Sequence, residues 1–178
     1  NTFFYVALAT GLRIGEVLAL MWDDIDFKKG CLHVTKTRLS VKLGEPITGP
    51  PKTSGSKRKV FLDSDTIEVL KAHRLEQVEK RLSSSVWQDY GLLFCDQKGC
   101  ACHRSNYNLY LSATCNKIGL PVLTPHSFRH THATFLLAQG IPIQVIADRL
   151  GHIPGTGAGA FGMTAHYSHV TDEARKEA

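Results

Sequence analysis

The chain has 178 residues, of which 43% are hydrophobic, and this size and composition suit one globular domain with a hydrophobic core. Its formal net charge of +5 favours a polyanionic partner. No apolar run approaches the roughly 20 residues that a membrane-spanning helix needs, so the sequence excludes a helical integral membrane protein.

The first third of the chain predicts two helices followed by a strand-rich region. The helical pattern of residues 2–10 stops at Gly11, a usual helix terminator. Apolar positions recur at helical spacing over residues 14–25, so a second helix begins just after Arg13. Arg13 therefore lies at a junction between two helices. From Gly30 the pattern alternates through CLHVTKT, GEPITGPP and KRKVFL, which predicts a small sheet with a Gly/Pro-rich connection.

The rest of the chain predicts four more helices joined by loops. We expect them over residues 65–82, 105–119, 125–140 and 142–151. Asp65 and Glu68 have capping-box spacing at the start of the first helix. Thr124 and Pro125 form a good N-cap and first-turn pair for the third. LLFC, residues 92–95, is a candidate short strand.

The third of these helices begins with HSFRHTH and carries unusual charge in its first turns. By helical spacing, the polar side holds His126, Arg129, His130 and Ala133, and the side expected in the core holds Phe128, His132, Phe135 and Leu136. Near a helix N-terminus, unpaired N–H groups and the positive end of the dipole favour an anion, and Arg129 adds a fork of donors matched to phosphate. The alternative is that the histidines are solvated first-turn residues. His132 is predicted to be a core histidine.

Several separated segments then resemble, in order, the signature of the tyrosine recombinases, the lambda-integrase-like family. They are ATGLRIGE, PPKTSGSKRKV, HSFRHTHAT, RLGH and YSHV. Within the family, the likeness is greatest to integrases of phages and conjugative transposons. The resemblance covers Ala9 to Val170. It implies an α+β, mainly α-helical catalytic domain with a small antiparallel β-sheet.

The resemblance implies six catalytic residues, which are Arg13, Lys52, His126, Arg129, His152 and Tyr167. Tyr167 would be the nucleophile, and Glu16 and His130 would be supporting residues that orient the others. Lys57 is an alternative to Lys52, because the run KTSGSKRK holds several cations.

The chemistry explains why these residue types are needed together. A phosphodiester carries negative charge on its non-bridging oxygens, and charge develops further in the transition state, so two arginines would clamp those oxygens without a metal. The two histidines would hydrogen-bond or exchange a proton with the tyrosine hydroxyl, and the lysine would protonate the leaving 5′ oxygen. The product is a 3′-phosphotyrosyl link that keeps the bond energy, so neither ATP nor a metal nor any other cofactor is implied.

The chain departs from the family pattern in two places. His152 and Tyr167 are farther apart than in the family, and removing residues 156–162 would restore the usual interval, so we expect an extra segment there. The family's DNA-binding domains would precede Asn1. We therefore interpret residues 1–178 as the catalytic domain of a longer recombinase.

The resemblance also implies partners and a setting. The expected function is site-specific recombination that integrates or excises a mobile element. The expected partners are double-stranded DNA carrying the recombination sites and other copies of the chain, in a homo-tetramer on synapsed DNA, with accessory DNA-bending or directionality factors as a further class. Five cysteines, an odd number, and no signal segment fit reduced thiols in a bacterial cytoplasm, on DNA and away from membranes.

Other readings of the sequence stay open. CDQKGCACH, residues 95–103, holds four candidate zinc ligands, although it lacks the paired spacing of most structural zinc sites. IPIQVIADRLGH, residues 141–152, resembles a helix-turn-helix element, which would fit a non-enzymatic DNA-binding regulator. A type IB topoisomerase would use the same covalent chemistry. Lys57, Arg58 and Lys59 form either a solvated strand edge or a set of phosphate contacts.

Overall fold

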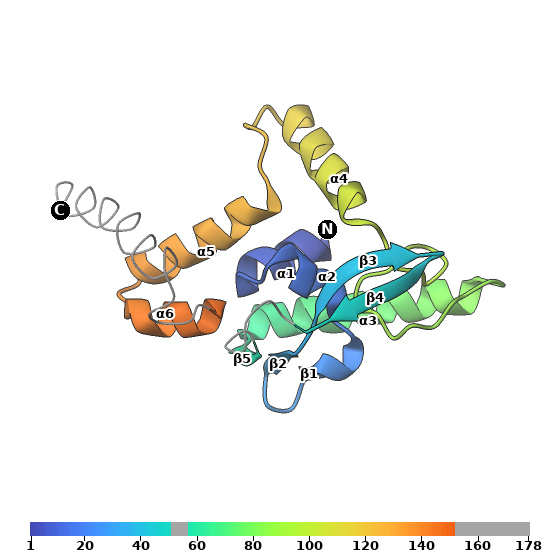
Figure 1. The fold of residues 1–178 in the computed structure, drawn as a ribbon, viewed down its shortest axis with the longest axis horizontal. Coiled ribbons are helices and arrows are strands. Elements are labelled where there is room, and N and C mark those ends of the chain that lie inside the picture. Colours follow the sequence, from blue (N-terminus) through green and yellow to red (C-terminus); the bar gives the residue numbers. More distant parts are fainter. Residues whose placement is uncertain (51–56, 152–178) are drawn as a thin grey trace.

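The computed structural model of the chain describes residues 1–50 and 57–151, and it confirms the predicted α+β, mainly helical fold (Figure 1). The helices are α1 (Thr2–Thr10), α2 (Ile14–Ala19), the 3-10 turn η1 (Trp22–Asp24), α3 (Ser64–Ser83), α4 (Arg104–Lys117), α5 (Pro125–Ala138) and α6 (Ile143–Leu150). The strands are β1 (Ile25–Asp26), β2 (Cys31–Val34), β3 (Thr37–Lys42), β4 (Glu45–Gly49) and β5 (Arg58–Phe61). None of the helices in these ranges is both long and apolar enough to cross a membrane.

In the described residues, two antiparallel sheets replace the single sheet that the alternation predicts. β2 lies between β1 and β5, and Leu32 is paired with Val60 across the β2–β5 ladder. β3 and β4 form a separate hairpin. β3 packs on α2, and the two elements approach closely at Gly15, where a Cβ atom would be 2.6 Å from Thr37 Oγ1.

The second helix ends earlier than its apolar pattern predicts. α2 ends at Ala19 rather than near Ile25, and η1 and β1 follow it. The reason is a long-range backbone bond, since the Leu93 N–H donates to the Leu20 carbonyl oxygen at 2.9 Å. The chain after α2 is thus paired with a distant segment, and this pairing competes with continuation of the helix.

The later helices occur where the sequence predicts them, with small shifts at their ends. The N-cap of α3 is Asp63 rather than Asp65, and its carboxylate accepts a first-turn N–H at 2.6 Å. The predicted strand over residues 92–95 is wrong, because only an isolated bridge joins Leu92 to Met21 there. These shifts leave the order of helices unchanged.

The main hydrophobic core lies between α1, α2, α3 and the β1–β2–β5 sheet. Phe3 of α1 stacks on Tyr107 with 3.9 Å between ring centroids and meets Phe94 edge-on at 5.2 Å. A second buried cluster joins α5 to α6 and contains Ala133, Ile146 and Leu150. Figure 1 shows α1 and α2 near the centre of the molecule, with α5 and α6 on one side of them. The ends of α1 and α6 are therefore held close together by packing.

His132 of α5 is buried, with 7% of the residue exposed, which confirms the prediction of a core histidine. The Arg149 Nε–H donates to His132 Nε2 at 3.0 Å. Burial, followed by the positive charge of Arg149, lowers the pKa of His132 to about 4. The expectation that Phe135 lies in the core is wrong, since 62% of that residue is exposed. The predicted apolar side of α5 is therefore covered only in part.

The buried, neutral His132 predicts a specific loss of stability in mild acid. Its pKa of about 4 in the folded chain lies below the ordinary value near 6.5, so the unfolded chain binds the extra proton as pH falls through this window. We expect the free energy of unfolding, measured with urea, to fall between pH 7.5 and pH 5 by about 1–2 kcal/mol more in the wild-type chain than in His132→Gln. Equal losses in the two chains would contradict this assignment.

Candidate active site

Arg13 occupies the junction between α1 and α2, as the sequence predicts. It is the N-cap of α2, and its side chain is 40% exposed. Glu16, in the first turn of α2, holds it twice: the Arg13 backbone N–H donates to Oε2 at 2.9 Å, and Nη1 donates to Oε1 at 3.0 Å. The first turn of the helix thereby orients the Arg13 guanidinium.

Glu16 is itself almost fully buried, with 2% of its side chain exposed. Arg58 of β5 donates to both of its oxygens, from Nη2 at 2.9 Å and from Nη1 at 3.2 Å. Burial alone would raise the pKa of Glu16, but the hydrogen bonds and charge of Arg58, and then those of Arg13, outweigh it and lower the pKa. The carboxylate is therefore ionised at neutral pH, and the group of two guanidiniums and one carboxylate carries net positive charge.

Arg129, expected on the polar side of α5, is buried, with 5% of the residue exposed. Its Nη1 donates to the Gly11 carbonyl oxygen at 2.9 Å, and its Nη2 donates to the Leu150 carbonyl oxygen at 2.7 Å. These acceptors are at the C-terminal ends of α1 and α6, where carbonyl groups lack helical partners. Local spacing along α5 could not reveal them, because they belong to distant elements.

His126 lies at the start of α5, on its exposed side, next to His130, with 4.6 Å between the two ring centroids. Burial lowers the pKa of His126, and the charges of His130, Arg129 and Arg13 lower it further. The ring is therefore mainly neutral at pH 7 and can accept or pass on a proton. The N-terminus of the helix forms as predicted, since the Ser127 N–H donates to Thr124 Oγ1 at 3.3 Å.

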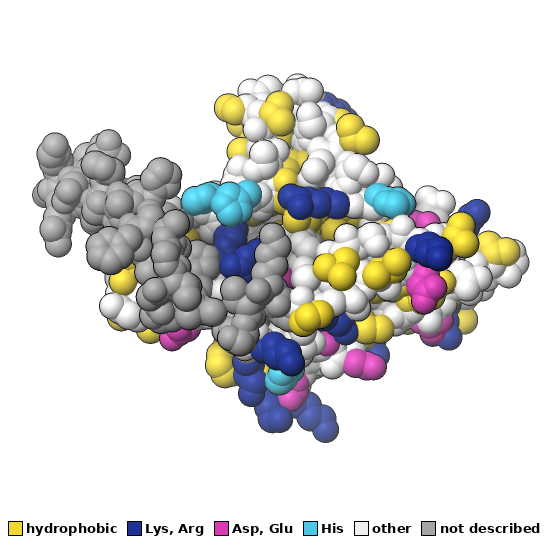
Figure 2. Space-filling model, viewed as in Figure 1, with side chains coloured by type: hydrophobic (Ala, Val, Ile, Leu, Met, Phe, Trp, Pro, Cys, Tyr) yellow, Lys and Arg dark blue, Asp and Glu magenta, His cyan; other side chains and the backbone are white. Residues whose placement is uncertain are grey.

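The structure brings three of the six predicted residues to one cavity of about 400 Å³. Its charged and imidazole side chains are those of Arg13, Glu16, Arg38, Arg104, His126 and Arg129. Figure 2 shows histidine side chains beside Lys and Arg side chains near the middle of this face. The other three predicted residues, Lys52, His152 and Tyr167, lie outside the described residues, as does the extra segment over 156–162.

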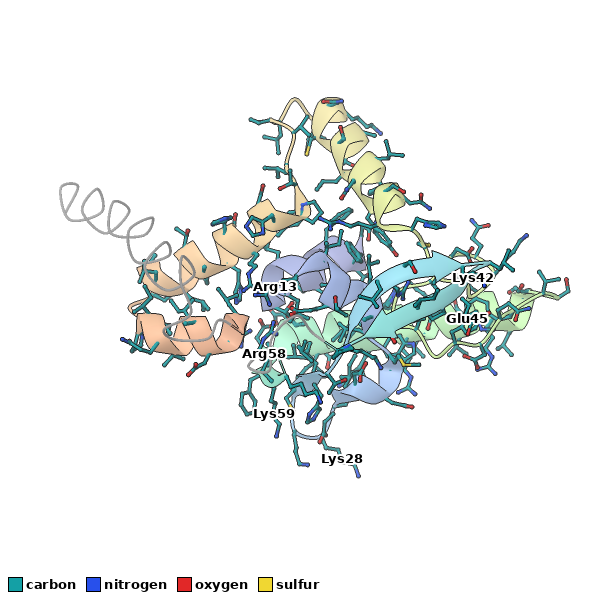
Figure 3. All side chains as sticks on the ribbon, in the orientation of Figure 1. Arg13, Lys28, Lys42, Glu45, Arg58 and Lys59 are labelled. Carbon is teal, nitrogen blue, oxygen red and sulfur yellow. The ribbon has the colours of Figure 1, made fainter. Side chains whose placement is uncertain are left out.

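Arg58 lies beside the site, and the sequence did not predict its role there. It was expected at a solvated edge or on phosphates, yet only 6% of its side chain is exposed. The signal was present in the strand alternation, because Arg58 and the buried Val60 lie on the same face of β5. Lys57 and Lys59 are exposed, so both interpretations stay open for them. Figure 3 shows Arg13 and Arg58 as neighbours between the helices and the sheet.

The candidate zinc ligands do not form a metal site in the described ranges. Among residues 1–50 and 57–151, no three His, Cys, Asp or Glu side chains gather in a way that could hold a metal ion. The cysteines of the CDQKGCACH segment are free thiols. Burial raises the pKa of Cys95 to about 11. That thiol is consequently protonated at neutral pH and a poor ligand.

Removing the charge of Glu16 is expected to lower the free energy of unfolding. Glu16→Gln leaves two guanidiniums against a neutral amide in a buried setting, and breaking a buried ion pair in this way costs about 3 kcal/mol or more. Urea denaturation at pH 7 measures the loss. Glu68→Gln is the matched control, because Glu68 is 70% exposed and its ion pair with Lys71 is on the surface, so it should change stability by less than about 0.5 kcal/mol. Similar small effects of both substitutions would contradict the prediction.

Comparisons with known proteins agree with one another. The model of the phage integrase family matches residues 1–174. The chain is 34% identical to a tyrosine recombinase XerC-like protein of Caldanaerobacter subterraneus subsp. tengcongensis, over 100% of this chain and 47% of that protein. It is 31% identical to the integrase of Staphylococcus phage L54a, over 97% of this chain and 48% of that protein. The chain thus spans about half the length of the curated relatives it matches.

The fold has a close counterpart among solved structures. The Tn1549 transposon integrase, in complex with transposon right end DNA, superposes with a TM-score of 0.78 and 22% sequence identity. The match covers 99% of this chain and 57% of that one. At this identity the likeness concerns the fold, and the mainly helical domain with small antiparallel sheets is common to both.

Proposed function

Because the chain belongs to the phage integrase family of tyrosine recombinases, we propose that it is the catalytic part of a recombinase that breaks and rejoins duplex DNA at specific sites. One observation carries the proposal. Arg13 and Arg129, far apart in the sequence, line one cavity together with His126. Such a concentration of fixed positive charge suits a phosphodiester whose oxygens become more negative in the transition state.

Each predicted residue has a part in the proposed reaction. The guanidiniums of Arg13 and Arg129 would bind the non-bridging oxygens of the scissile phosphate. The Tyr167 hydroxyl, with an ordinary pKa of about 10, would lose its proton to a histidine, His126 or His152, as its oxygen attacks phosphorus. Lys52 would give a proton to the departing 5′ oxygen.

Attack forms the bond between phosphorus and the tyrosine oxygen and breaks the bond to the 5′ oxygen of the next nucleotide. The products are a 3′-phosphotyrosyl ester and a free 5′ hydroxyl. A 5′ hydroxyl from a second duplex reverses the step and joins the two strands. The energy of the original ester is kept, so the exchange needs no nucleotide hydrolysis.

The proposal extends to partners and to the rest of the protein. The Tn1549 integrase is known with transposon right end DNA, and we propose that duplex DNA is likewise the partner of this chain. Four copies would assemble on two synapsed sites, with accessory DNA-bending or directionality factors. Since the chain spans about half the length of its curated relatives, we propose that it is the catalytic domain and that separate DNA-binding domains complete the enzyme.

Covalent capture tests the proposal without knowledge of the target site. The wild-type chain is incubated with nicked duplexes of randomised sequence, and DNA that stays attached in denaturant is recovered and sequenced. We expect a defined sequence to be enriched. If no duplex is captured, the proposal is wrong. If the chain relaxes supercoiled plasmid but never joins two duplexes, it is a type IB topoisomerase instead.

Tyr167→Phe is expected to abolish covalent attachment, because the substitution removes only the nucleophilic oxygen. DNA affinity, measured by fluorescence anisotropy with the enriched duplex, should stay unchanged. A Tyr167→Phe chain that still traps DNA would show that another residue is the nucleophile.

Arg129→Ala is expected to slow covalent attachment by about 100-fold to 1,000-fold, the scale for losing a charge-stabilising donor. Because Arg129 also bonds two carbonyl groups, Arg129→Lys is measured beside it, and the melting temperature of each variant is compared with that of the wild-type chain. A near-normal rate in a folded Arg129→Ala chain would remove Arg129 from the reaction.

A further inference from the structure

In the described part of the chain, three arginines from different elements meet at the C-terminal end of α6. Arg58 Nε donates to the Arg149 carbonyl oxygen at 2.6 Å. Arg129 Nη2 donates to the next carbonyl oxygen, that of Leu150, and Arg13 Nη2 approaches the following one at 3.5 Å. The last carbonyls of a helix lack helical donors and carry the negative end of its dipole, so guanidiniums are suitable partners.

Arg58 links this helix end to the Arg13–Glu16 pair. The same guanidinium that bonds the Arg149 carbonyl through Nε binds Glu16 through both terminal nitrogens. A planar guanidinium can serve both acceptors at once in a fixed geometry, whereas a lysine ammonium is a single point of charge on a flexible stem. Arg58 thereby sets the distance and orientation between the carboxylate that holds Arg13 and the end of α6.

Gly151 gives independent evidence that the Arg58 guanidinium packs tightly against the end of α6. It ends α6 in the left-handed region with φ +69°, and a Cβ atom there would be 2.8 Å from Arg58 Nη1. A side chain at position 151 would therefore both strain the backbone and push the Arg58 guanidinium aside. The chain continues from Gly151 directly to His152, one of the proposed catalytic residues.

Burying the charged Arg58 side chain costs free energy, and a role in holding neighbouring groups in place would account for this burial. This side chain is 6% exposed, so its charge is largely removed from water, and its guanidinium binds the same Glu16 carboxylate as that of Arg13. Buried ion pairs of this kind contribute little net stability compared with apolar packing, but they fix geometry. Among the described residues, Arg13 and Arg129 line the cavity, whereas Arg58 does not.

We propose that Arg58 is a positioning residue for DNA cleavage: through Glu16 it orients the Arg13 guanidinium, and through the Arg149 carbonyl it fixes the end of α6. This inference rests on the proposed function. Arg58 acts on the reaction only through Arg13 and through the residues that follow α6. Its loss should therefore resemble a partial loss of Arg13 and leave DNA binding intact.

The test compares Arg58→Gln and Arg58→Lys with Lys28→Gln, a control at an exposed position in the turn between β1 and β2 (Figure 3). The probe is the duplex enriched in the capture experiment, used at saturating concentration in single turnover. A second probe carries an uncharged methylphosphonate at the cleaved linkage. Because that linkage has one non-bridging oxygen replaced by a methyl group, it has no negative charge for Arg13 to neutralise.

We expect both Arg58 variants to cleave the ordinary duplex about 100-fold more slowly than the wild-type chain, the scale for a misplaced catalytic group, with unchanged affinity. On the methylphosphonate duplex their rates should approach that of the wild-type chain. Lys28→Gln should match the wild-type chain on both probes. If Arg58→Gln does not fold, Gly151→Ala, which displaces Arg58 without removing it, replaces it in the same comparison.

Three results would overturn the inference alone, each with a wild-type chain that cleaves normally. They are full activity of Arg58→Gln on the ordinary duplex, full activity of Arg58→Lys, and an equal slowing on both probes, which would mean that Arg58 does not act through the charge of Arg13. A wild-type chain that never attaches to DNA would instead overturn the proposed function, and the inference with it.

Discussion

The site depends on one buried carboxylate that must remain charged. Glu16 is 2% exposed, and a carboxylate with so little water around it keeps its charge only if donors surround it. Arg13 and Arg58 supply those donors from the start of α2 and from β5, and each arginine is oriented by doing so. The need of the Glu16 carboxylate for donors therefore connects α2 to β5 and directs the Arg13 guanidinium toward the cavity.

The hydrophobic core makes this arrangement rigid. α1 is anchored by Phe3 among aromatic rings, and α6 is anchored on α5 by Ile146 and Leu150. Arg149 adds polar ties between these elements, because it donates to the carbonyls of Ala9 and Phe61 and to His132. Two helix ends that are fixed by packing can hold a buried guanidinium in one orientation, and preorganised cations cost no rearrangement when charge develops.

Much of the fold could be predicted from local sequence signals, whereas the burial of the site could not. Capping by Thr124 and the helix end at Gly151 follow from residues next to each other in the chain, so the sequence predicts both. The early end of α2 depends on a bond from Leu93, and the burial of Arg129 depends on carbonyls of α1 and α6. Such partners are brought together only by the fold. The convergence of Arg13, His126 and Arg129 was predicted from the family resemblance, not from spacing.

The bond between Arg13 and Gly151 spans 138 positions of the chain, which has a consequence for synthesis. A ribosome produces the Arg13–Glu16 turn early, but the carbonyls that complete its surroundings are made only when α6 has been translated. An eight-residue helix such as α6 is too short to persist without tertiary partners. Nascent chains that stop before it therefore lack the carbonyls to which Arg13, Arg58 and Arg129 donate, and this cluster of guanidiniums is complete only once α6 has been made.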